Sequence, residues 1–67
     1  MDNNNLTKKR NAVMYLGKTI RIICMDGESA YNGRIGKVTY VDDIGQLHGT
    51  WGGCALIPGL DDFTVIG

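Results

Sequence analysis

Residues 33–51 have the sequence GRIGKVTYVDDIGQLHGTW, and this run predicts two strands joined by a tight turn. β-Branched and aromatic residues flank the cluster at residues 42–45 on both sides. Asp tolerates turn conformations, and Gly45 can supply the positive φ that a hairpin with a longer loop needs. We expect Val38, Leu47 and Trp51 to meet in the dry centre of a small β structure.

Two details of this hairpin carry further expectations. The adjacent apolar residues Tyr40 and Val41 break strict alternation, so one of them should face the core and the strand should bulge or bend there. Gly49 lies between two inward positions of the second strand, and it leaves room for a large neighbour such as the Trp51 ring.

The remainder of the chain predicts one short helix and three more strands. We expect a disordered tail at residues 1–4, a helix at residues 5–16 and a barrel at residues 17–67. In the first strand, Ile20, Ile22 and Cys24 should face inward. The other expected elements are a first strand at 19–25, an irregular loop at 26–33, a turn at Gly52-Gly53, a strand at 54–57, a helical turn at 60–63 and a last strand at 63–66.

The composition describes one small globular domain without a dominant charge. The 67 residues are 43% hydrophobic and 21% charged, with a formal net charge of zero. Residues 1–37 hold all seven Lys and Arg and three acidic residues, a formal charge of +4, whereas residues 38–67 hold four Asp, a charge of −4. This composition excludes a disordered chain and a uniformly basic surface for nucleic acid, and it leaves open a basic face.

The two cysteines predict reduced thiols in a cytoplasmic protein. Cys24 and Cys54 have neither C-x-x-C spacing nor a set of zinc-binding partners. The sequence begins with polar residues and contains no apolar run of membrane-spanning length, so we expect no membrane association. Both thiols should be mostly buried, with a Cys24–Cys54 disulfide as the alternative.

No set of residues predicts catalysis, a metal or a cofactor. His48 beside Asp42 or Asp43 could act as a base, but no nucleophile accompanies it, so we expect a solvent-facing histidine and no enzyme activity. The acidic pairs 42–43 and 61–62 lack the alternation of a calcium loop, and turn or capping roles account for them. No glycine-rich phosphate-binding motif occurs.

The order of elements is similar to that of the SH3-like barrel, with five strands and an N-terminal helix. The pieces GRIGKV at 33–38 and VDDIGQLH at 41–48, together with Trp51, resemble a small uncharacterised bacterial and phage domain family with the pattern G-x-x-G-x-V, V-D-D-x-G-x-[IL]-H-V-x-W, D-x-G. The chain departs from this pattern at Gly49, where the family has an apolar residue, and at Gly52-Gly53-Cys54, where it has D-x-G. The resemblance implies a mainly β fold, a bacterial, phage or mobile-element source, and no activity.

These observations predict a non-enzymatic interaction module for an unknown protein partner or for a second copy of the chain. The expected contact residues are Tyr31, Arg34, Tyr40 and His48. The alternative is nucleic-acid binding, with salt-dependent phosphate contacts. Those contacts would come from Lys8, Lys9, Arg10, Arg34 and Lys37.

Overall fold

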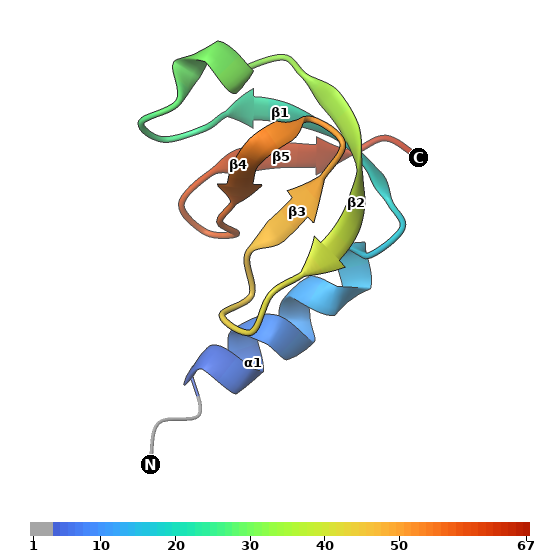
Figure 1. The fold of residues 1–67 in the computed structure, drawn as a ribbon, viewed down its shortest axis with the longest axis vertical. Coiled ribbons are helices and arrows are strands. Elements are labelled where there is room, and N and C mark those ends of the chain that lie inside the picture. Colours follow the sequence, from blue (N-terminus) through green and yellow to red (C-terminus); the bar gives the residue numbers. More distant parts are fainter. Residues whose placement is uncertain (1–3) are drawn as a thin grey trace.

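The computed structural model describes residues 4–67, and it contains a five-stranded antiparallel sheet preceded by one short helix (Figure 1). The strand order is β4-β3-β2-β1-β5, so β4 and β5 are the two edges and the sheet is open. A mainly β fold is thereby confirmed, whereas closure into a barrel is not. The elements are α1 (Asn4–Ala12), η1 (Val13–Tyr15), β1 (Thr19–Cys24), η2 (Ser29–Tyr31), β2 (Ile35–Val41), β3 (Leu47–Gly49), β4 (Gly52–Leu56) and β5 (Asp62–Val65).

The N-terminal helix occurs where the sequence predicts one. It begins at Asn4 and continues after Ala12 as the single 3₁₀ turn η1, which ends before the positive-φ residue Gly17. The predicted disordered tail lies outside the described residues, apart from Asn4.

Strand β2 bends so that each half pairs with a different neighbour. Its first half pairs with β1, where Gly36 lies opposite Ile20, and its second half pairs with β3, where Val41 lies opposite Leu47. The register shifts between Val38 and Tyr40, which confirms the predicted bulge. After the shift Val41 is buried while Tyr40 is 56% exposed.

The core consists of buried apolar side chains from the helix, the strands and the segments that join them. Trp51 is 3% exposed, and its indole Nε1 donates a 2.7 Å hydrogen bond to the carbonyl oxygen of Cys54, so its polar edge is satisfied inside the core. The expected meeting of Val38, Leu47 and Trp51 is confirmed. The buried hydrophobic residues are Ala12, Ile20, Ile22, Met25, Val38, Val41, Leu47, Trp51 and Leu56.

The inward position predicted for Cys24 is wrong. Ile20 and Ile22 are fully buried, but the pairing of β1 with β5 shifts register between Ile22 and Cys24. The shift turns Cys24 to the surface and brings Met25 into the core in its place. Both cysteines are free, and only Cys54 is partly buried.

Two predicted turns also differ. Gly52-Gly53 begins strand β4, and the chain reverses at Thr50-Trp51 instead, because Gly49 and Gly52 pair across the two strands. The helical turn predicted at residues 60–63 is absent, because Asp62 and Phe63 already belong to β5, which pairs with β1. The predicted last strand is present.

Candidate functional site

The helix α1 is held against the turn between β2 and β3. Ala12, at the end of α1, is buried at 2% exposure. Three residues later, the ring of Tyr15 packs edge-on against that of Phe63, with ring centroids 5.1 Å apart. At the turn, Gly45 has φ +83° and lies directly against the backbone of Lys8. Because Gly45 has no side chain, it can adopt the positive φ of the turn and also lets the helix approach closely.

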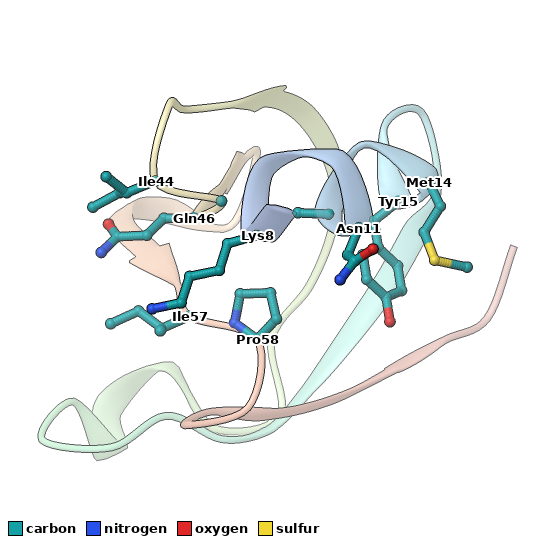
Figure 2. Close-up of a pocket in the computed structure, with 10 residues that line it drawn as sticks. Lys8, Asn11, Met14, Tyr15, Ile44, Gln46, Ile57 and Pro58 are labelled. Atoms are coloured by element: carbon teal, nitrogen blue, oxygen red, sulfur yellow. The ribbon is translucent and has the colours of Figure 1, made fainter. Parts of the chain in front are cut away.

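A cavity of about 390 Å³ lies between these elements. Its walls come from α1 and η1 on one side, from the β2–β3 turn on the second and from the segment after β4 on the third (Figure 2). Its size is within the range of about 300–1,000 Å³ that is common for ligand sites. The lining residues, which we call the helix groove, are Lys8, Asn11, Ala12, Met14, Tyr15, Ile44, Gly45, Gln46, Ile57 and Pro58.

The helix groove is mainly apolar and has exposed apolar residues at its rim. Met14 is 67% exposed and Ile44 is 45% exposed. Among the lining residues that the structure describes, Lys8 alone carries a charge, and Figure 2 shows its side chain reaching from the helix toward Ile57 and Pro58. Such a surface can hold an apolar group, and the amides of Asn11 and Gln46 can hydrogen-bond a polar neighbour.

The turn that carries Ile44 and Gln46 is organised by one carboxylate. Asp42 Oδ1 accepts hydrogen bonds from the backbone N–H groups of Gln46 at 2.8 Å and Ile44 at 3.2 Å, and its Oδ2 lies 2.9 Å from His48 Nε2. Burial raises the pKa of the Asp42 carboxyl, but the hydrogen bonds from His48, Gln46 and Ile44 outweigh burial and hold the pKa below its ordinary value of 3.8. Asp42 is therefore ionised at neutral pH and positions two residues of the helix groove.

A second hollow of about 320 Å³ adjoins the helix groove, since both are lined by Tyr15 and Pro58. The second hollow follows the start of β5, where Asp62 is exposed. Asp61 is buried at 6% exposure, and its two oxygens accept from the backbone N–H groups of Asp26 and Ile57, both at 2.8 Å. The carboxylate that this hollow leaves accessible is therefore that of Asp62.

The four contact residues predicted from the sequence lie in two separate pairs. The rings of Tyr40 and His48, on β2 and β3, have centroids 5.5 Å apart. The guanidinium of Arg34 lies 4.3 Å from the centre of the Tyr31 ring and donates a 2.7 Å hydrogen bond to the carbonyl oxygen of Trp51. This second pair packs against Gly52 and so supports the start of β4. Neither pair lines the helix groove.

The five predicted phosphate-contacting cations have different surroundings. Lys9 Nζ forms a 2.9 Å ion pair with Asp43, and that hydrogen bond together with the Asp43 charge raises the pKa of Lys9. Arg34 is engaged with Tyr31 and Trp51, as above, and Lys8 lines the helix groove. Arg10 and Lys37 are exposed. Two of the five cations therefore already have partners within the chain.

Sequence reasoning missed most of the helix groove. Of its lining residues, Lys8 alone was among the expected contacts, for a different function. Two of the lining residues are apolar at positions where polar residues are expected, which is a weak indication of a binding surface. Met14 lies near the end of a polar helix, and Ile44 lies inside a tight turn. Ile57 and Pro58 gave no such indication, since they join the groove only through tertiary packing.

Within residues 4–67 no three His, Cys, Asp or Glu side chains come close enough together to hold a metal ion. The same part of the chain contains no helix of the length and hydropathy needed to cross a bilayer.

Comparison with known proteins gives one family match. A family model with the description "Domain of unknown function (DUF4314)" matches residues 4–66. No curated protein and no solved structure matches the chain.

Proposed function

Since the chain belongs to the DUF4314 family, a family of unknown function, we propose that it is a non-enzymatic protein-interaction module. In this proposal the helix groove receives an apolar side chain from a segment of a partner protein. The docked helix supplies one wall of the groove, and the β2–β3 turn and the segment after β4 supply the others.

The observation that carries the proposal is the exposed apolar rim of a mainly apolar cavity. Met14 and Ile44 stand at the rim with 67% and 45% exposure, and Ile57 and Pro58 continue the apolar wall. Contiguous exposed apolar surface around a hollow is typical of interaction sites, because leaving it in water costs roughly 25 cal/mol for each Å².

The SH3-like barrel remains part of this proposal. It is supported by the strand order β4-β3-β2-β1-β5 and by the bend that lets β2 pair with both neighbours. NOEs between the edge strands β4 and β5 in solution would show that the barrel is closed. Their absence would show that the sheet is open.

Affinity capture from a lysate of the source organism tests the proposed function. The variant Asn11→Trp places an indole in the helix groove, and Val13→Trp places one on the same segment outside the lining. We expect the wild type and Val13→Trp to retain the same partner protein, identified by mass spectrometry, and Asn11→Trp to lose it. Capture that is equal in all three proteins, or no specific capture by the wild type, would contradict the proposal.

The alternative outcome of the same experiment is nucleic-acid binding. Its contacts would come from Lys8, Lys9, Arg10, Arg34 and Lys37. Capture that disappears after nuclease treatment and weakens steeply with salt would favour it, because phosphate contacts release counterions. We place it second because Lys9 and Arg34 already have partners within the chain.

A further inference from the structure

We infer that the helix groove selects a segment of a partner protein in which a large apolar side chain lies next to an Asp or Glu. This inference rests on the proposed function and adds the chemistry of the partner. It assigns to Lys8 the role of contacting the partner's carboxylate.

The first argument is the contrast between two consecutive lysines of α1. Lys9 is neutralised by Asp43 at 2.9 Å, outside the groove lining. Lys8 reaches across the groove, and among residues 7–67 no carboxylate forms an ion pair with it. The groove thus presents one positive charge beside apolar walls, and complementarity in charge favours an anionic group in the ligand.

The second argument concerns the orientation of the bound ligand along the groove. The adjoining hollow beyond Tyr15 and Pro58 contains Asp61 and the exposed Asp62. The oxygens of Asp61 are occupied by backbone N–H groups, so Asp62 supplies the accessible negative charge there. A carboxylate of the ligand is therefore attracted at the Lys8 end and repelled at the Asp62 end.

The third argument concerns the class of ligand. The amides of Asn11 and Gln46 in the groove can pair with the backbone N–H and C=O groups of an extended chain. A cavity of about 390 Å³ accommodates one or two side chains of such a segment. These features fit a short extended peptide in which an apolar residue enters the cavity and the neighbouring acidic residue meets Lys8.

Selection from a random heptapeptide phage library tests the inference without assuming a sequence. The library is selected on the wild-type protein and counter-selected on Asn11→Trp, with Val13→Trp as the control that should keep binding. We expect the enriched peptides to place Asp or Glu within two positions of a large apolar residue.

Titration of the best synthetic peptide then measures the role of the charge. Replacing its acidic residue by Gln or Asn should lower the affinity about two- to five-fold, as is typical of a partly exposed ion pair. Lys8→Met, which keeps the length of the side chain, should lower it equally and should abolish the difference between the two peptides. Lys8→Glu should prefer the peptide in which Lys replaces the acidic residue. Thermal unfolding of each variant confirms that it is folded.

The outcomes separate the inference from the proposed function. Peptides that are excluded by Asn11→Trp but contain no common acidic residue, or that bind Lys8→Met as tightly as the wild type, would overturn the inference and leave the proposed function standing. A selection that enriches no peptide sensitive to Asn11→Trp would contradict both.

Discussion

At the scale of single residues, the core depends on two glycines against which the Trp51 ring packs. A Cβ at Gly49 on β3 would overlap the Trp51 ring, and a Cβ at Gly36 on β2 would crowd the Thr50 hydroxyl oxygen, the Trp51 backbone nitrogen and the edge of the same ring. In this chain the space that a side chain at position 49 would fill is taken by the indole of Trp51.

We therefore expect Gly49→Ala to destabilise the protein strongly. A methyl group there would collide with the Trp51 ring and with the carbonyl oxygen of Lys37, and overpacking of this kind costs about 1–3 kcal/mol. Urea denaturation followed by the fluorescence of the single Trp measures the loss. The matched control is Gly53→Ala, where the new methyl group meets nothing within 4 Å, and its stability should stay unchanged or rise by up to about 1 kcal/mol. Equal stabilities for the two variants would contradict this packing.

A second prediction at this scale concerns Asp42 and pH. Because its folded-state pKa lies below the ordinary 3.8, the unfolded chain binds more protons in that range, so the stability from Asp42 is present above about pH 4 and is lost as the pH falls through the folded-state pKa. Asp42→Asn removes this titration. We expect the wild type to be the more stable protein at pH 6 and the difference to shrink toward pH 2.5, measured as the free energy of unfolding in urea. A difference that is constant with pH would be the contrary result.

At the scale of elements, the helix and the turn between β2 and β3 form one unit. Gly45 contacts the backbone of Lys8, and Lys9 pairs with Asp43 of the same turn. Since a helix of nine residues is marginal alone in water, α1 depends on this docking for its own stability. The helix groove exists only while the helix is docked.

The stabilities of two Gly→Ala variants distinguish the cost of disturbing the docked helix from the cost of backbone strain. Gly45 and Gly27 have similar positive φ values, +83° and +76°, but a Cβ meets the Lys8 backbone at the first and nothing within 4 Å at the second. Both Ala variants should lose roughly 1–2 kcal/mol through the left-handed backbone. Gly45→Ala should lose about 1–3 kcal/mol more through the collision with the helix. It should also shift the amide NMR resonances of α1, whereas similar losses and unchanged α1 resonances would refute the docking contact.

At the scale of the whole molecule, Asp61 joins two loops that are far apart in the sequence. Its carboxylate accepts from the backbone N–H groups of Asp26, at the start of the long loop after β1, and of Ile57, directly after β4. Residues 26–33 are further tied down by Asn32, whose side-chain oxygen accepts from the Met25 N–H at 2.8 Å. The long loop is thereby held to the body of the protein.

Asp61→Asn should weaken both loops together. The amide group of Asn presents one oxygen and one NH₂ group, so one of the two backbone N–H groups loses its acceptor, at a cost of about 1–3 kcal/mol for a buried donor. Hydrogen exchange should speed up at the amide of Asp26 or Ile57. The exposed neighbour provides the control, because Asp62→Asn should change stability by less than about 0.5 kcal/mol. If both variants behave alike, Asp61 does not join the loops.

The sequence by itself determined the mainly β class, the N-terminal helix, the Asp42–Gly45 turn and the core position of Trp51, because these follow from local alternation, turn chemistry and apolar residues next to glycines. Tertiary structure alone decided the rest. Cys24 faces out because of a register shift against β5, and Gly52 enters β4 because it pairs with Gly49. The helix groove brings together residues 8–15, 44–46 and 57–58, which lie in three separate parts of the chain. The ion pair that distinguishes Lys9 from Lys8 depends on where the helix docks. Neither register nor docking is encoded by a local pattern, since both depend on contacts made after the strands have paired.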